Sequence, residues 1–174
     1  AKKTIGDFCR HHKVKFIGLG SGPGSREVER FLREFLREDE AIEAKLVTVN
    51  EAGSNAYGTG AAGKEEFPKL DPRVRAAVTI ARRLQDPLSE LVKLEPKSIG
   101  VGPYQRDVDQ GILSGALRDV MECCVNRVGV DVNRATERQL KYVAGIGPKR
   151  AKTLVAYRTE KGGIKSRAEL LAVE

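Results

Sequence analysis

Seven residues near the C-terminal end decide the fold of this chain: Ala144-Gly145-Ile146-Gly147-Pro148-Lys149-Arg150. Glycine adopts positive φ angles without a steric cost, so Gly145 and Gly147 predict a tight turn that interrupts a helix. Pro148 suits the first position of the next helix, because the N–H group that proline lacks would be unpaired there anyway. We therefore expect two helices joined by a short hairpin, with Ile146 pointing inward to anchor the turn.

Positive charge follows this hairpin directly, at the start of the second helix. There, unpaired N–H groups and the helix dipole already favour an anion. Nothing in the stretch is suited to reading base edges, so it predicts a phosphate contact that tolerates any nucleic-acid sequence. This is a helix-hairpin-helix module, and its candidate nucleic-acid-binding residues are Gly145, Ile146, Gly147, Lys149, Arg150 and Lys152. A turn that only joins two packed helices is the alternative.

The charge of the whole chain agrees with a polyanionic partner. The formal net charge is +7, and the pI is about 9.4. From Val128 onward, ten Lys and Arg stand against five Asp and Glu, whereas the preceding 127 residues hold 21 against 19. The basic part is therefore the last quarter of the chain. Aromatic residues are only 5% of the sequence, and Trp is absent, so a base-stacking platform is poorly supplied.

The N-terminal part alternates strands with a helix. Short apolar runs predict strands at residues 14–19 and 45–49, and apolar residues at helical spacing predict a helix at residues 26–38 between them. This order favours a parallel pair of strands. Asp71 and Pro72 predict the start of a further helix that extends to about residue 85.

A glycine-rich loop, residues 18–25, joins the first strand to the first of these helices. Its position suggests either a nucleotide-binding loop or a simple turn. The loop lacks the Lys-Ser/Thr ending of a P-loop, and no G-x-G-x-x-G pattern fits it. A tight turn with Ser25 as the cap of the following helix is therefore favoured, although a helix N-terminus is able to contact an anion.

Residues 97–106 predict the boundary between two domains, because Gly100, Gly102 and Pro103 are turn formers. After this loop only helices are expected, with Asn133 or Thr136 capping the one before the hairpin. The prediction is an α/β domain over residues 1–96 and an all-α, helix-hairpin-helix domain over residues 97–174.

Four segments resemble the Tex family of bacterial transcription accessory proteins and their eukaryotic elongation-factor relatives: residues 80–88, 97–105, 130–135 and 140–151. The resemblance implies that the first region is the C-terminal part of a YqgF-type domain, an RNase H-like fold related to RuvC resolvases. It also implies nucleic acid, RNA or DNA, as the partner, and a role beside the transcription machinery. Full-length members carry further N-terminal helical regions and an oligonucleotide-binding barrel, so the chain is expected to be an excised core.

RNase H-like nucleases need several carboxylates to hold two metal ions, and this chain supplies only one of them. Glu51 matches the second carboxylate, but the strand that carries the first is missing. Arg75 and its two neighbouring alanines stand where the last is expected. We therefore expect no enzymatic activity, with a metal-dependent RuvC-type or RNA nuclease as the alternative. A protein–protein scaffold of the transcription machinery is the second alternative. An affinity for nucleic acid that does not change with salt concentration, or no such affinity, would favour it.

The remaining features predict no cofactor, no metal and no membrane association. Cys9, Cys123 and Cys124 do not form a disulfide framework, which favours a reducing compartment. Cys9 with His11 and His12 has no second pair of ligands elsewhere. The expected location is the cytoplasm, or the nucleus or an organelle in a eukaryote.

Overall fold

The computed structural model describes residues 1–173 and divides into two compact units, Ala1–Asp86 and Pro87–Glu174. The first unit is mixed α/β and the second is helical, as the sequence predicts. The division falls about ten residues before the boundary expected at residues 96–97. Residues 87–96 thus group with the helical unit, where Val92 and Leu94 are buried.

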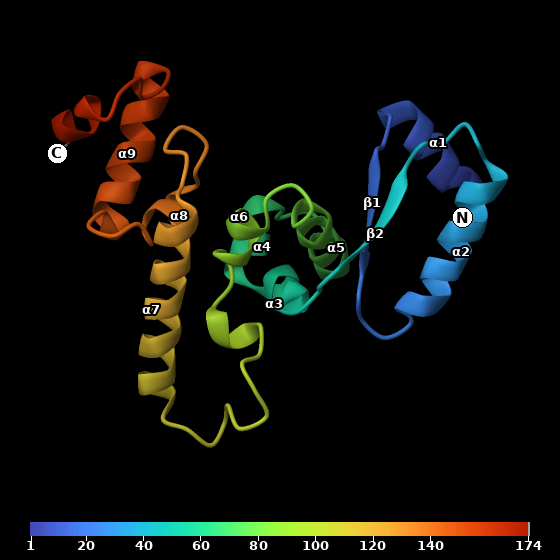
Figure 1. The fold of residues 1–174 in the computed structure, drawn as a ribbon, viewed down its shortest axis with the longest axis horizontal. Helices are drawn as coiled ribbons and strands as arrows, with labels where there is room; N and C mark the ends of the chain where they lie inside the picture. The colour runs from blue at the N-terminus through green and yellow to red at the C-terminus, as the bar shows by residue number, and fades with distance from the viewer. Residues whose placement is uncertain (174) are drawn as a thin grey trace. The chain divides into compact units, whose positions relative to one another are not determined.

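The first unit contains a two-stranded parallel sheet and five helices, and the sequence analysis anticipated both strands and two of the helices (Figure 1). Strand β2 has the predicted bounds, and strand β1 begins two residues later than predicted. The two strands pair in parallel, from Phe16 opposite Lys45 to Gly20 opposite Val49. The elements are α1 Lys2–His12, β1 Phe16–Gly20, α2 Ser25–Glu38, β2 Lys45–Val49, α3 Ser54–Thr59, α4 Ala61–Glu66 and α5 Pro72–Arg82.

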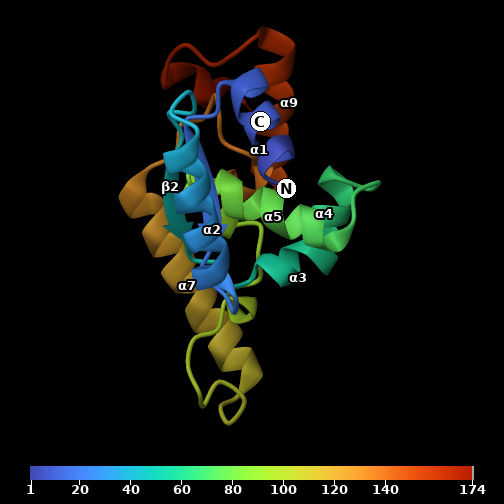
Figure 2. The same cartoon turned by 90° about the vertical axis from the view of Figure 1, so that its right-hand side faces the viewer.

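Helices cover both faces of this sheet. On one face, Ile17 packs with Cys9 of α1 and Phe35 of α2, which are buried together. Figure 2 views this side, with α2 in front of the strands. On the other face, a Cβ atom at Gly18 would lie only 3.1 Å from Leu84 and 3.5 Å from the backbone of Ala81. The absence of a side chain at Gly18 therefore lets α5 and the turn after it pack directly on the sheet.

The two helices of this unit with a predicted cap residue begin in different ways. The side chain of Asp71 accepts a hydrogen bond from the N–H of Arg73 at 2.8 Å, so the predicted cap of α5 is confirmed. The prediction that Ser25 caps α2 is wrong. Gly24 holds the cap position with φ 83°, and Ser25 is already the first helical residue, without a side-chain cap bond. A left-handed turn, which glycine adopts readily, starts the helix there.

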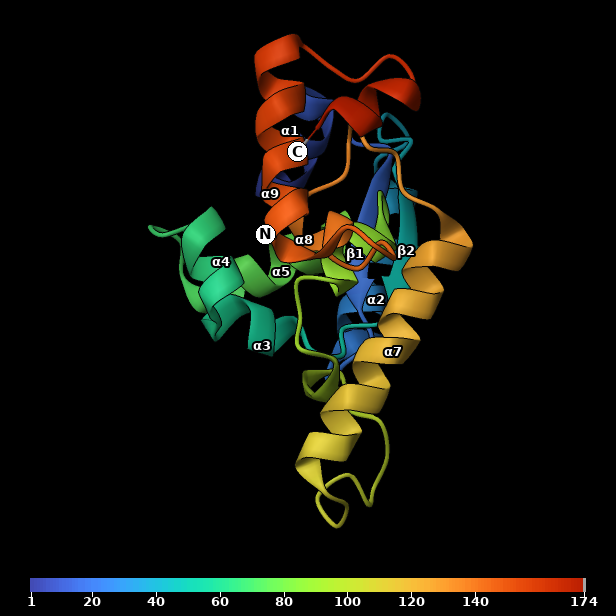
Figure 3. The same ribbon diagram turned by 90° about the vertical axis from the view of Figure 1, so that its left-hand side faces the viewer.

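The second unit is built from helices and two 3-10 turns (Figures 1 and 3). Helix α7 is the longest at 19 residues, and the side chain of Asp109 caps it by accepting from the N–H of Ile112 at 2.8 Å. The elements are α6 Pro87–Leu91, η1 Pro96–Ser98, α7 Gln110–Val128, α8 Glu137–Leu140, α9 Gly147–Lys161 and η2 Ala168–Ala172.

A small apolar core holds α8 and α9 together. Partly buried side chains, among them Val155 and Tyr157, pack against this cluster and extend it along α9. The buried members of the core are Ala135, Leu140, Ala151, Leu154 and Ile164.

Polar side chains close this core at the far end of α9. The side chain of Asn133 donates to the carbonyl of Ile164 at 2.8 Å and accepts from the N–H of Ile164 at 2.7 Å. Arg158 donates to the carbonyls of Val132 and Ala135 at 2.8 and 2.6 Å. The loop before α8 is therefore bound to the end of α9, and the two helices form one rigid motif.

Candidate nucleic-acid interface

The turn between α8 and α9 has the backbone geometry that its glycines predict. Gly145 has φ 80° and Gly147 has φ 63°, both in the region that side chains disfavour. Helix α8 begins with a reciprocal cap, in which the side chains of Thr136 and Gln139 each accept from the other residue's backbone N–H. Of the two caps that the sequence left open, Thr136 is the one at the helix start. The reciprocal cap thus fixes the start of the helix that precedes the hairpin.

Ile146 lies between the two glycines and turns toward the apolar core. It is half-buried and packs against the cluster that contains Leu140 and Leu154. The expected inward direction is confirmed, although burial is incomplete. The side chain of Ile146 thus anchors the loop to the apolar core, and the backbone of the loop remains exposed to solvent on the other side.

Replacing Ile146 by alanine should cost about 1–2 kcal/mol of unfolding free energy, because full burial would cost about 2–5 kcal/mol and this side chain is only half-buried. Leu154 is only 6% exposed, so Leu154→Ala should lower the unfolding free energy by the full amount of about 2–5 kcal/mol. Urea unfolding monitored by circular dichroism measures both. If Ile146→Ala lowered the unfolding free energy as much as Leu154→Ala does, Ile146 would have to be as fully buried as Leu154.

The outer side of the hairpin is open. A Cβ atom built on Gly145 or Gly147 would meet no other atom within 4 Å. Among residues 1–173, the backbone N–H groups of Gly147 and Lys149 donate no hydrogen bond. Such unpaired N–H groups at the start of a 15-residue helix form a suitable site for a phosphate oxygen.

The three cationic side chains expected at this site are all exposed. Within the described part of the chain, Lys149, Arg150 and Lys152 make no ion pair. Their charge is therefore available to a ligand. The structure brings together the six residues proposed from the sequence, from the hairpin to the first turns of α9.

Arg150 also forms a hydrogen bond within the protein that the sequence did not predict. Its guanidinium donates to the carbonyl of Gly145 at 2.8 Å, across the hairpin. The side chain thereby braces the turn, and its remaining N–H groups are left for an anion. The five-residue spacing carries no sequence signal for this bond, since it depends on the positive φ angles of the glycines.

Asn126 of α7 is a further residue that the sequence analysis did not identify. Its side chain donates to the carbonyl of Tyr142 at 3.0 Å and accepts from the N–H of Ala144 at 2.9 Å. One side-chain amide thus pairs with the backbone just before Gly145, as a neighbouring strand would. This pairing holds the hairpin against the C-terminal part of α7.

The carboxylate considered for nuclease chemistry lies in a different setting. Glu51 is half-buried, and its carboxylate fills the space above Gly20 and Gly22, where a Cβ atom would overlap it. Arg75 is buried and donates to the carbonyls of Gly58, Phe67 and Pro68. Residues 1–173 contain no group of three or more His, Cys, Asp or Glu side chains arranged to hold a metal ion.

All three cysteines are free thiols. Burial raises the pKa of the Cys9 thiol, which disfavours its reactive thiolate. No helix within the described residues has the length and apolar character that crossing a membrane requires.

Comparison with known proteins matches both units. The family model of the Tex protein YqgF-like domain matches residues 1–85, and the helix-hairpin-helix motif matches residues 125–174. Protein YhgF of Escherichia coli (strain K12) is 46% identical over 173 residues, which are 99% of this chain and 22% of that protein. The transcriptional accessory protein Tex of Neisseria gonorrhoeae is 45% identical over 170 residues, 98% of this chain and 22% of that protein.

A human relative extends the likeness beyond bacteria. S1 RNA-binding domain-containing protein 1 of Homo sapiens is 41% identical over 160 residues, which are 91% of this chain and 16% of that protein. This chain therefore spans about a fifth of the length of the curated relatives it matches. The chain has the α/β unit and the helix-hairpin-helix unit of these proteins in the same order, and the likeness covers nearly its whole length. It therefore belongs to the Tex-type transcription accessory protein family.

Proposed function

We propose that this chain binds the phosphate backbone of RNA or DNA through its hairpin, without preference for sequence and without cutting the strand. The observation that carries the proposal is the open N-terminus of α9. Unpaired N–H groups of Gly147 and Lys149 lie beside three exposed cations that have no ion-pair partner in the described residues. A helix start with this charge attracts a phosphate, and it offers nothing that distinguishes one base from another.

The relatives support a place for this binding in transcription. One of them is named a transcriptional accessory protein and another an S1 RNA-binding domain-containing protein. On this basis the segment contributes a backbone contact to a larger transcription accessory protein that works beside the transcription machinery. Such a role places it with nucleic acid in the cytoplasm, or in the nucleus or an organelle of a eukaryote, and its free thiols suit a reducing compartment.

The test is a salt-dependent binding titration of the 174-residue chain against two unrelated DNA duplexes and two unrelated single-stranded RNAs. Three phosphate contacts on a duplex give a slope of log K against log salt of about −2 to −3. Both duplex sequences should give the same slope and the same affinity. Binding that does not change with salt would instead support the protein-scaffold alternative, and a strong preference for one sequence would show base readout.

The non-catalytic part of the proposal has its own test. Incubation with Mg²⁺ or Mn²⁺ should leave labelled RNA and DNA intact, because within the described residues Glu51 is not joined by the further carboxylates that a metal pair needs. Gel electrophoresis of the nucleic acid measures this. A Glu51→Gln variant is the control: cleavage by the unaltered chain that disappears in this variant would establish nuclease activity and refute the proposal.

A further inference from the structure

A basic pocket of about 360 Å³ lies within the second unit, apart from the hairpin itself. Three segments form its walls: the chain from the end of α6 through η1, one face of α7, and α8 with the turn after it. Its size is near the lower end of the range for small-molecule sites. The residues with charged or aromatic side chains in the lining are Lys93, Glu95, Lys97, Arg118, Arg138, Lys141 and Tyr142.

Two of the cations in this lining are balanced by nearby carboxylates. Lys93 pairs with Glu90 at 2.6 Å, and both side chains are almost fully buried. Lys97 lies 3.5 Å from Glu95. The positive character of the pocket therefore rests on the cations that come from α7, α8 and the turn after α8.

Two of these cations are free to act on a ligand. Within the described residues, Arg118 of α7 and Lys141 form no ion pair, and both are exposed. The ammonium of Lys141 lies over the ring of Tyr142, 4.8 Å from its centre. Because a cation above an aromatic ring keeps its full charge, this contact orients Lys141 without neutralising it.

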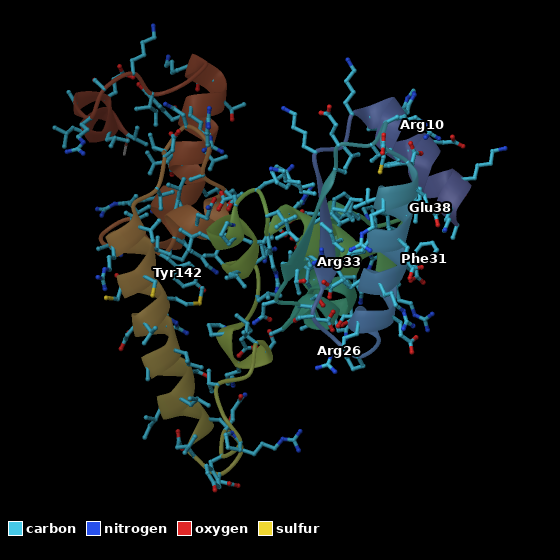
Figure 4. The ribbon with its side chains drawn as sticks, turned by 45° about the vertical axis from the view of Figure 1, so that its right-hand side comes forward. Arg10, Arg26, Phe31, Arg33, Glu38 and Tyr142 are labelled. Atoms are coloured by element: carbon cyan, nitrogen blue, oxygen red, sulfur yellow. The ribbon has the colours of Figure 1, made fainter. Side chains whose placement is uncertain are left out.

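The pocket and the hairpin share one rigid connection. Tyr142 lines the pocket, and its carbonyl is bonded by Asn126, whose side chain also binds Ala144 at the start of the hairpin. Figure 4 shows Tyr142 beside the upper part of α7. A ligand in the pocket is therefore held at a fixed position relative to the N-terminus of α9.

We propose that this pocket receives a second backbone phosphate of the nucleic acid that the hairpin binds, which rests on the proposed function. Arg118 of α7 and Lys141 of the turn after α8 are the two contacts. The unbalanced positive charge, the concave shape and the fixed connection to the hairpin all favour a phosphate that belongs to the same strand or duplex.

The experiment is the same salt titration, with the Arg118→Ala/Lys141→Ala pair in the full 174-residue chain. The slope for a DNA duplex should shrink by about 0.9, because the variant no longer neutralises the one phosphate in the pocket, and the affinity should fall by roughly 10-fold at about 0.1 M salt. The control pair Arg127→Ala/Lys165→Ala removes the same charge from exposed positions of the same unit outside the pocket, and should leave the slope nearly unchanged. The charge-keeping pair Arg118→Lys/Lys141→Arg should retain most of the slope.

The outcomes separate this inference from the proposed hairpin site. If the pocket pair kept the slope of the unaltered chain while the hairpin pair Lys149→Ala/Arg150→Ala reduced it, the phosphate site in the pocket would be refuted and the hairpin site would be supported. The reverse result would refute the hairpin site and support the pocket. Equal reductions in the pocket pair and in its control pair would refute the pocket in favour of diffuse charge. Tighter binding of adenosine monophosphate than of an oligonucleotide would also refute it, because the pocket would then serve a free nucleotide.

Discussion

Changing Lys149 and Arg150 to alanine should weaken binding to a DNA duplex by roughly 10- to 100-fold at about 0.1 M salt. The slope of log K against log salt should shrink by about 0.9 for each phosphate that is no longer neutralised, and the variant removes two cations. Both side chains are exposed at the open start of α9 and have no ion-pair partner among residues 1–173. Fluorescence anisotropy with a labelled duplex, measured across salt concentrations, gives both quantities. The reduction should be the same for unrelated sequences.

The two single variants should differ in kind. Lys149→Ala removes charge alone. Arg150→Ala also removes the bond to the carbonyl of Gly145, so it should weaken binding more than the change in slope accounts for. Arg150→Lys keeps the charge and removes the planar donor group, which isolates the contribution of this brace.

The matched control is the Arg30→Ala/Arg33→Ala pair on α2. Arg33 already pairs with Glu29 at 2.8 Å, which compensates part of its charge, and Figure 4 shows it on a helix of the first unit. This pair should change the slope by much less than the hairpin pair. Equal reductions from both pairs would mean that net charge, rather than the hairpin, determines binding.

Replacing Arg75 by methionine should lower the free energy of unfolding by about 3–5 kcal/mol. The side chain is 6% exposed, and its guanidinium donates to three backbone carbonyls, at 2.9 Å to Phe67, 3.0 Å to Gly58 and 3.2 Å to Pro68. Methionine fills similar space but removes the donor from these three carbonyls, of which the contact to Gly58 is buried and the other two are partly buried, and each unsatisfied buried group costs about 1–3 kcal/mol.

Urea unfolding followed by circular dichroism measures this change in the first unit. Arg73→Met is the control, because Arg73 is exposed on the same helix. An exposed substitution of this kind should stay within about 0.5 kcal/mol of the unaltered chain. Similar midpoints for the two variants would show that the guanidinium of Arg75 is not needed to hold the turns around α3 and α4.

Arg75 also shows where sequence reasoning about this fold stops. Asp71 and Pro72 predicted this helix correctly, yet its apolar residue Val74 is 47% exposed. The buried side of α5 includes Arg75, Ala76 and Thr79 instead. A buried arginine is justified only by the three carbonyls around it, and these come from other segments of the chain. No periodicity along α5 itself contains that information.

The sequence predicted correctly several features that depend only on neighbouring residues. The bounds of β2, the cap at Asp71 and the positive φ angles of Gly145 and Gly147 all follow from residue types close together in the chain. Residues 52–63 are rich in glycine and alanine and have no amphipathic pattern, so the sequence alone predicts no helix there. This stretch forms α3 and α4, where Tyr57 is 1% exposed and Gly58 allows close approach to the backbone of Pro72.

The candidate site divides in the same way. Its six residues follow from the hairpin sequence and its charge, and their role in binding stays a prediction. The support behind them could not be predicted, since Asn126 reaches the hairpin from 16 and 18 residues away. An asparagine in a long helix is most often a solvated side chain, and only the fold shows that this one replaces a missing backbone partner.

The Asn133–Ile164 pair bears on how the protein is made. Its two partners are 31 residues apart, and contacts of this separation form only when both ends of the segment exist. On the ribosome, the hairpin at residues 145–147 therefore emerges while the loop before α8 is still unbound. The hairpin cations are present at that moment, but the surface that carries them is not yet fixed. The two Asn133–Ile164 hydrogen bonds can form only after residue 164 has left the exit tunnel, so the end of α9 joins the loop before α8 late in the translation of this motif.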